Sequence, residues 1–312
     1  MPKVDRSNPK RSGASESRYT LMDFMREFPD DEACLNWLWR TRFSEDGEHA
    51  WCPKEGRERA FKRYDTAQRR QSWTCTGCGY HLHPTAGTIF SKSATALHLW
   101  FYGIYLMTST RCGISAKQLE RELGVGYKTA WRMFHLIRSL LAEDATDLTG
   151  TVEVDTTYIG GKARYTNGMT RSAAIKAGMA KKVTVLGMVE RGGRVRAIVN
   201  PEHPLAIGVR AHVLPSSIVY TDEAAAFQRL GNHGYQHSRV HHKLKVYVDG
   251  DVHTNTIEGF WSLVKRGIGG VYHSVSAKYL QMYLDEYAYR YNHRHDDTDL
   301  FTLVMREAAS GR

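Results

Sequence analysis

The spacing of apolar and polar residues changes several times along this chain, and each change marks a segment. Within residues 19–46, a helix is expected to begin near Asp30, directly after Pro29. The side chains that this helix should bury are Cys34, Leu35 and Leu38. Residues 47–90 have no helical period and are rich in Gly, Cys, His and Trp. They predict a small, loop-rich module that needs a cross-link or a metal to hold it together.

Residues 91–147 return to a helical period and contain two short helices around a glycine turn. The first is expected to begin at Ser115, whose hydroxyl can cap it, and to end at Gly124. The second should run from Tyr127 to Arg138. This spacing is typical of a helix-turn-helix, although two helices that merely pack together have the same pattern. The side chains that would contact DNA phosphates or base edges are Lys128, Thr129 and Arg132.

After the helical pair, strands and helices alternate in the order β-β-β-α-β-α-β-α. The run T-V-E-V-D-T-T-Y-I-G at 151–160 alternates as a strand. Two more strands are joined at Gly192 and Gly193, which is a hairpin signal. The run S-I-V-Y-T-D at 217–222 is a buried strand. This order predicts one mixed α/β domain over residues 148–312.

The segment H-T-N-T-I-E-G-F-W-S-L-V-K-R at 253–266 opens a further helix at its Thr/Asn pair, where Asn255 is expected to be the cap. The apolar stripe of this helix comprises Ile257, Phe260, Trp261 and Val264. The polar stripe beside it comprises Asn255, Glu258, Ser262 and Lys265. A well-packed aromatic helix has no structural need for a carboxylate and an amide along its rim, so this stripe is a candidate for function. One more helix should span about 276–292.

Three carboxylates of the α/β domain are candidate ligands for a metal ion. The pleat of the strand at 151–160 directs Glu153 and Asp155 to the same face. Asp222 ends another strand, and ligands gather at the carboxyl ends of strands in such sheets. Carboxylates repel one another and seldom cluster without a cation, and Mg²⁺ prefers oxygen ligands of this kind. Glu258 is the expected third ligand, although Asp222 by itself is more typical of a simple turn or helix cap.

A second candidate metal site pairs C-P-K-E at 52–55 with C-T-G-C at 75–78. Paired C-x-x-C turns make a zinc ribbon, but here Glu55 stands where the first pair should have its second cysteine. The remaining thiolates are Cys52, Cys75 and Cys78. The fourth ligand is either absent or one of Glu55, His49, His81 and His83. The alternative is a ribbon without metal that is held together by Trp51, Trp73 and Phe61.

Composition indicates a partner and a compartment. The formal net charge is +10 and the pI is about 9.3, which predicts a polyanionic partner, most simply nucleic acid. No apolar run reaches the roughly 20 residues of a membrane span. Residues 1–18 lack the apolar core of a signal peptide and are expected to be a disordered basic arm. Five cysteines with one C-x-x-C pair fit a reducing compartment better than a disulfide framework.

The motifs follow one another in a fixed order between about residues 28 and 294. They are C-T-G-C-G-Y with G-T-I-F, S-A-K-Q-L-E-R-E-L-G-V-G-Y-K-T-A-W-R-M, E-V-D-T-T-Y-I-G-G-K, V-Y-T-D-E, H-T-N-T-I-E-G-F-W-S-L-V-K-R-G-I and Y-R-Y-N-H-R. In this order they resemble bacterial insertion-sequence transposases with an N-terminal zinc ribbon and an RNase H-like DDE domain, relatives of the eukaryotic Merlin elements. The departure at Glu55 concerns the zinc ribbon and leaves the other motifs untouched.

The resemblance implies a chemistry and a set of roles. It implies cleavage and strand transfer of double-stranded DNA at the terminal inverted repeats of the element, with Mg²⁺ or Mn²⁺ held by Asp155, Asp222 and Glu258. Some relatives have Asn as the third member, which makes Asn255 a rival to Glu258. The basic residues expected to contact the DNA are Lys162, in a loop rich in Lys and Arg, and Lys265 with its neighbour Arg266. The resemblance also implies a homo-oligomer on DNA in the bacterial cytoplasm, at the nucleoid.

Two other classes of protein compete with this interpretation. One is a DNA-binding regulator that has kept the zinc ribbon and the helix-turn-helix but has lost catalysis. The carboxylates argue against it, because a binding module has no use for Asp155, Asp222 and Glu258. The other is a structure-selective nuclease with the same fold. The ribbon and the helix-turn-helix argue against that class, since they favour recognition of specific DNA ends. Inverted repeats flanking the coding region would separate these classes.

Overall fold

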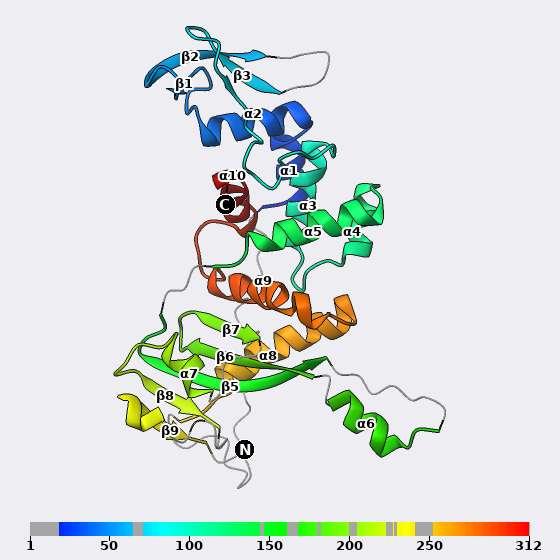
Figure 1. The fold of residues 1–312 in the computed structure, drawn as a ribbon, viewed down its shortest axis with the longest axis vertical. Coiled ribbons are helices and arrows are strands. Elements are labelled where there is room, and N and C mark those ends of the chain that lie inside the picture. Colours follow the sequence, from blue (N-terminus) through cyan, green and yellow to red (C-terminus); the bar gives the residue numbers. More distant parts are fainter. Residues whose placement is uncertain are drawn as a thin grey trace, which may run out of the picture. The chain divides into compact units, whose positions relative to one another are not determined.

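The computed structural model describes residues 19–64, 71–143, 147–160, 168–179, 182–199, 205–222, 227, 230–240 and 252–311. These residues form two compact units, which Figure 1 draws as ribbons. The first unit contains the described residues up to 140 together with 295–311, and the second contains those from 141 to 294. The predicted basic arm over 1–18, Lys162 and most of the helix predicted after Asp222 lie outside the described residues.

Helices form the core of the first unit. They are α1 (Leu21–Glu27), α2 (Asp31–Arg42), α3 (Leu97–Ser109) and α10 (Leu300–Ser310). The Asp30 side chain accepts the backbone N–H of Ala33 at 2.8 Å and caps α2, so this helix begins where the sequence predicts. The predicted apolar side is buried and comprises Cys34, Leu35 and Leu38. A cluster of aromatic rings joins these helices and includes Phe24, Phe28, Phe101 and Phe301.

A small antiparallel sheet packs on α2 in the same unit. Its strands are β1 (His49–Cys52), β2 (Arg57–Tyr64), β3 (Ser72–Cys75) and β4 (His81–Leu82), hydrogen-bonded in that order. The rings of Trp39 and Trp73 are stacked with their centroids 4.7 Å apart, which anchors the sheet on the helix. Phe61 is buried beside them, whereas Trp51 is 63% exposed. The apolar support of this sheet is therefore Trp39, Phe61 and Trp73, and the predicted contribution of Trp51 was wrong.

The two predicted short helices are α4 (Ala116–Leu123) and α5 (Tyr127–Ser139). The Ser115 hydroxyl accepts the backbone N–H of Gln118 at 3.1 Å and caps α4. Gly124 ends α4 with a left-handed φ of 63°, which a residue with a side chain adopts only with strain. Both ends of α4 are thus encoded by local residues. The buried side chains of the pair include Leu119, Leu123, Ala130 and Met133.

A five-stranded mixed sheet forms the centre of the second unit. Its strands are β5 (Thr151–Gly160), β6 (Lys182–Glu190), β7 (Val195–Val199), β8 (Ile218–Thr221) and β9 (Gln236–Arg239). The order across the sheet is β7-β6-β5-β8-β9. The β5–β6 and β6–β7 pairs are antiparallel, while β8 joins β5 and β9 in parallel. The mixed α/β architecture and the hairpin at Gly192 and Gly193 are confirmed.

Helices cover both faces of this sheet. On one face, α7 (Ala206–Arg210) contributes to a core with side chains that include Val152, Val154, Leu186 and Met188. On the other face lie α8 (Asn255–Gly267) and α9 (Leu280–Asn292), in a core with strand side chains that include Val185, Val189, Val195 and Ala197. Because side chains alternate along a strand, Glu153 and Asp155 lie on the face that α8 covers. None of the described helices is long and apolar enough to cross a lipid bilayer.

Besides the short helix α1, two helices were missed in the sequence. The first, α6 (Arg171–Met179), lies in the segment interpreted as a basic loop, and the hydroxyl of Thr170 accepts the backbone N–H of Ala173 at its start. The second is α10, which Asp299 caps by accepting the N–H of Thr302 at 2.8 Å. The predicted domain over residues 148–312 includes α10, but the contacts of this helix assign it to the first unit. Its apolar side, with Phe301, packs among the rings of that unit.

Candidate functional site

Asp155 lies near the middle of β5, on the face that α8 covers. The indole N–H of Trp261, on α8, donates a hydrogen bond to its carboxylate at 3.1 Å. Gly187 on β6 is directly opposite Asp155 in the sheet. A Cβ atom at Gly187 would lie 2.3 Å from the Trp261 ring, so only glycine allows the ring to approach the sheet this closely. Trp261, interpreted from the sequence as a core residue, is therefore also the hydrogen-bond donor to Asp155.

Asp222 and Glu258 approach Asp155 from β8 and α8. The parallel pairing of β5 with β8 places Val154 beside Thr221, so Asp155 and Asp222 follow at neighbouring positions. Asp222 is half-buried. Glu258 is exposed in the first turn of α8, and its carboxylate accepts the hydroxyl of Thr254 at 3.0 Å. The fold thus brings together three carboxylates from three separate segments of the sequence.

The carboxylates influence one another electrostatically. Burial, together with the negative charges of Asp222 and Glu258, raises the pKa of Asp155 to about 6, although the hydrogen bonds from Thr156 and Trp261 oppose the shift. The three groups do not converge as closely as the ligands of a preformed metal site. Among the described residues, a group of at least three candidate ligand atoms within 4.8 Å of one another occurs at the cysteines and not at these carboxylates.

Glu153 has a role that the sequence did not indicate. Its side chain is fully buried, and it accepts the backbone N–H groups of Thr256 and Ile257 at 2.8 and 3.1 Å. Its other oxygen accepts a hydrogen bond from Arg191 at 2.7 Å. The side chain of His253 lies 3.2 Å from the same oxygen. Glu153 therefore fastens the N-terminus of α8 to β5, where the helix dipole favours a negative charge.

The start of α8 agrees with the sequence, but its cap does not. The helix begins at the predicted Thr/Asn pair, with Thr254 in the cap position and Asn255 as the first helical residue. The hydroxyl of Thr254 donates to Glu258, and the first free N–H groups of the helix are bound by Glu153. The prediction that Asn255 caps the helix was wrong, because a carboxylate from a distant strand occupies that role. Asn255 is exposed, on the same helix as Glu258.

The basic residues expected to contact DNA lie on exposed surfaces of both units. On α5, Lys128 and Arg132 are exposed and Thr129 is half-buried. Two aromatic side chains beside them on this helix are also exposed, Tyr127 at 48% and Trp131 at 36%. On α8, the exposed side chains Lys265 and Arg266 lie in the last turn. Lys162 lies outside the described residues.

The cysteine cluster is the second candidate site. The four candidate ligand atoms, from Cys52, Glu55, Cys75 and Cys78, lie within 4.8 Å of one another. The Sγ atoms of Cys52 and Cys78 are 3.5 Å apart, and the Sγ of Cys75 is 3.8 Å from Oε1 of Glu55. Ligand atoms about 2.0–2.3 Å from a tetrahedral ion would be separated by about these distances, so the donor set fits zinc.

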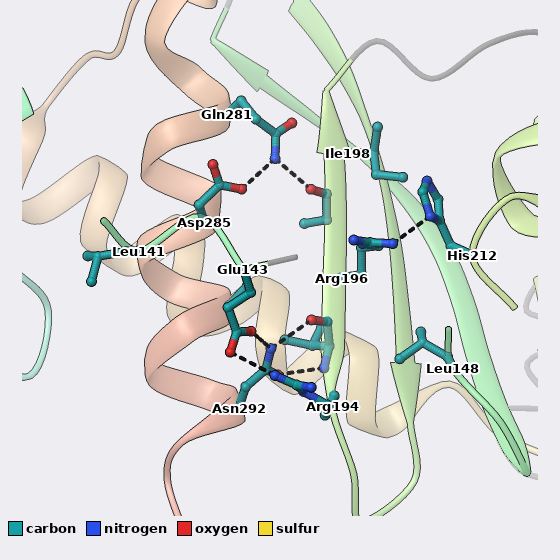
Figure 2. A pocket seen from close by; sticks show the side chains of 13 residues that line it. Leu141, Glu143, Leu148, Arg194, Arg196, Ile198, His212, Gln281, Asp285 and Asn292 are labelled. Atoms are coloured by element: carbon teal, nitrogen blue, oxygen red, sulfur yellow. Dashed lines mark hydrogen bonds and ion pairs between the residues drawn. The ribbon is translucent and has the colours of Figure 1, made fainter. Parts of the chain in front are cut away.

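A cavity of about 250 Å³ lies between β7 and α9, and none of the three carboxylates lines it. Figure 2 shows that amide side chains of α9 reach the edge strand there. Asn292 accepts the N–H of Val195 at 2.7 Å, and Gln281 accepts the N–H of Val199 at 2.9 Å. Gln281 and Asn292, the latter in the motif Y-R-Y-N-H-R at 289–294, thus protect a sheet edge that otherwise invites pairing with another chain.

Comparisons with known proteins identify a family. Residues 147–292 match the family model of the ISXO2-like transposase domain, and this range contains Asp155, Asp222 and Glu258. An uncharacterised protein in the transposable element ISH50 of Halobacterium salinarum is 28% identical over 278 residues, which are 85% of this chain and 92% of the relative. These two similarities support an insertion-sequence transposase, in which residues 147–292 match the ISXO2-like transposase domain.

Proposed function

We propose that this transposase binds the terminal inverted repeats of its own insertion sequence and catalyses Mg²⁺-dependent cleavage and strand transfer of DNA. The observation that carries the proposal is the trio Asp155, Asp222 and Glu258, which lies inside the family match and whose members interact electrostatically. An RNase H-like fold is part of the proposal. Its support is a mixed sheet with helices on both faces and the family match over the same residues.

The donor set suits a hard divalent cation. All three side chains offer carboxylate oxygens, which Mg²⁺ and Mn²⁺ prefer to nitrogen or sulfur. Burial and repulsion from the neighbouring carboxylates raise the pKa of Asp155, and a bound cation would relieve that cost. When bound, such ions activate a water molecule and stabilise the departing oxygen of a phosphodiester.

The residues of the chain have separate tasks in this proposal. Asp155, near the middle of β5, and Asp222, directly after β8, hold the cation, and Trp261 keeps the Asp155 carboxylate in one orientation through its indole N–H. Glu258 completes the site from α8, where its carboxylate is exposed and accepts a hydrogen bond from the hydroxyl of Thr254. A single side-chain rotation changes its position without moving the helix.

The DNA would be held mainly through its phosphates. Lys265 and Arg266 are exposed on the same helix as Glu258, so they are suited to contact the backbone next to the cleaved bond. On the first unit, Lys128, Thr129 and Arg132 would contact the transposon end from α5. The exposed rings of Tyr127 and Trp131 beside them add apolar surface for contact with bases or sugars.

Amide substitutions of the carboxylates test the proposed function. We expect Asp155→Asn, Asp222→Asn and Glu258→Gln each to lower cleavage of a duplex carrying the flanking inverted repeats by orders of magnitude, because an amide offers the cation no charge. Binding of the same duplex without Mg²⁺ should stay near wild type. Cleavage is measured on labelled duplex in Mg²⁺ and in Mn²⁺. Glu45→Gln, which changes an exposed carboxylate outside both candidate sites, is the control and should cleave normally.

The same assay decides between Glu258 and Asn255 as the third ligand. If Glu258 is the ligand, Asn255→Ala retains most of the activity, and because Glu153 caps the helix it also retains stability. If Glu258→Gln cleaves the duplex and Asn255→Ala does not, Asn255 is the third ligand and Glu258 is not. Wild-type rates in Asp155→Asn or Asp222→Asn would refute the site. Wild-type protein that binds the repeats but cleaves in neither metal would be the DNA-binding regulator.

A further inference from the structure

The two turns that carry the cysteine cluster have the same backbone geometry. In the first, C-P-K-E-G, the N–H of Gly56 donates to the carbonyl of Cys52 at 2.8 Å. In the second, C-T-G-C-G, the N–H of Gly79 donates to the carbonyl of Cys75 at 3.0 Å. Both glycines are left-handed, with φ of 64° and 73°. Glu55 therefore occupies in the first turn the position that Cys78 occupies in the second.

The two oxygens of Glu55 face different partners. Oε1 is 3.8 Å from the Sγ of Cys75, on the side of the thiols. Oε2 accepts hydrogen bonds from Arg57 at 3.0 and 3.1 Å and forms an ion pair with Arg59 at 3.1 Å. A Cβ atom at Gly77 would lie 2.0 Å from the guanidinium of Arg59 and 2.5 Å from Oε1, so the glycine of the second turn leaves space for both groups. The carboxylate is thus held with one oxygen directed at the three thiols.

The histidines that compete for the fourth position point elsewhere. Along β1, Cys52 and Ala50 are buried while His49 alternates to the opposite face, where its ring bonds Asp46 at 2.7 Å. His81 pairs with Thr74, which lies on the face opposite Cys75, and bonds its hydroxyl at 2.9 Å. The ring of His83 lies 6.4 Å from that of His81 and is exposed. None of these three described histidines belongs to the cluster.

Charge balance also favours a ligand carboxylate. Three thiolates and one carboxylate carry two more negative charges than a divalent cation neutralises. Arg57 and Arg59 supply matching positive charge, and they bind the oxygen that does not face the thiols. A carboxylate that served only the arginines would have no need of a position among three thiols.

We propose that Glu55 is the fourth ligand of a structural zinc ion, bound through Oε1 together with Cys52, Cys75 and Cys78. The site is then a closed Cys₃Glu centre in which a carboxylate replaces one thiolate of a zinc ribbon. The small sheet has few buried apolar side chains, and a metal would supply folding energy that it lacks. This inference does not depend on the proposed DNA chemistry and holds for the protein with or without cleavage activity.

The ligand shell can be measured directly on the full chain purified without chelators. X-ray absorption at the zinc edge should give three sulfur atoms at about 2.3 Å and one oxygen at about 2.0–2.2 Å in the wild type, without the scattering of an imidazole ring. Glu55→Cys should give four sulfur atoms and hold zinc more tightly. Glu55→Gln should lower zinc affinity by at least about tenfold in competition with a chromophoric chelator.

Matched variants separate ligation from ion pairing. Glu58→Gln, an exposed position on β2 outside the cluster, should leave zinc affinity unchanged. Arg57→Gln removes one arginine partner of Glu55 and should weaken zinc binding less than Glu55→Gln does. A histidine in the wild-type ligand shell, an unchanged affinity in Glu55→Gln, or a folded wild type with zinc content near zero would each overturn the proposal.

Discussion

In the candidate site, Asp155 is the residue whose ionisation depends most clearly on its neighbours. It is half-buried, it accepts one hydrogen bond from Trp261, and its pKa is raised to about 6 by burial and by two nearby carboxylates. A carboxyl group whose pKa is higher in the folded than in the unfolded protein favours folding only while it is protonated. At neutral pH the ionised group therefore destabilises the metal-free fold.

This cost predicts a stabilising substitution. Below about pH 3.8, the pKa of Asp155 in the unfolded chain, the protonated group makes its full contribution to the free energy of unfolding. This contribution is lost as the pH rises through about 6, its pKa in the folded protein. In Mg²⁺-free buffer at about pH 7.5, Asp155→Asn should therefore unfold at higher denaturant concentration than the wild type. The gain should be at most about 3 kcal/mol, from a shift of about two pKa units. It should shrink toward about pH 4, and Mg²⁺ should stabilise only the wild type.

The comparison with the wild type isolates this effect. Asp285 also has a pKa raised to about 6, by burial in α9, and it contributes equally to both proteins. An Asp155→Asn protein that is less stable than the wild type at every pH would show that the ionised carboxylate is well solvated or already paired.

At the scale of elements, the position of α8 depends on one buried carboxylate. Glu153 joins β5 to the first turn of α8 and pairs with Arg191, whose side chain is 23% exposed. The guanidinium of Arg191 also lies over the ring of Tyr220 on β8, 4.7 Å from its centroid. The pair of Glu153 and Arg191 therefore connects β5, which carries Asp155, with β8, which precedes Asp222, and with α8, which carries Glu258.

Breaking this connection should be costly. Glu153→Gln leaves the Arg191 charge without its partner and weakens the bonds to the N-terminus of α8, so we expect a loss of about 3 kcal/mol. Arg191→Gln should cost a similar amount. The double variant should lose much less than the sum of the two, because the interaction is removed only once. Urea unfolding of the four proteins measures this coupling, and strictly additive losses would show that the pair contributes nothing.

For the whole molecule, the chain leaves the first unit after residue 140 and returns to it after residue 294. The returning segment forms α10, and the ring of Phe301 lies 4.6 Å from that of Tyr19 and 5.9 Å from that of Phe24. Phe260 has the corresponding place in the second unit, in the core between α8, α9 and the sheet. Each unit thus has its own buried aromatic anchor.

Two substitutions should each destabilise one unit and leave the other unit folded. Phe301→Ala is expected to destabilise the first unit by about 3–5 kcal/mol through the cavity it leaves, and Phe260→Ala should do the same to the second. Hydrogen exchange read by mass spectrometry should rise in α1 and α3 for Phe301→Ala while β5 and β6 stay protected. For Phe260→Ala, exchange should rise in β5 and β6 while α1 and α3 stay protected. Equal loss of protection everywhere in both variants would mean that the units unfold together.

The sequence by itself determined the elements whose signals are local. Asp30, Ser115 and Gly124 mark helix ends through hydrogen bonds and backbone angles that involve only a few neighbouring residues. Alternating residues marked β5, and the glycine pair marked the hairpin between β6 and β7. The residues of both candidate sites were also chosen from the sequence, since carboxylates at strand ends and paired cysteine turns carry recognisable chemistry.

The tertiary structure decided which groups meet. Glu153 and Thr256 are 103 residues apart in the sequence, and no local pattern shows that a strand carboxylate will cap a distant helix in place of Asn255. The choice of Glu55 over three histidines likewise depends on which faces of the strands carry them. The missed α10 has its partners in the first unit, far from its neighbours in the chain. Contacts of this kind arise from packing between separate segments. The spacing of apolar residues within one segment carries no information about which other segment it will meet.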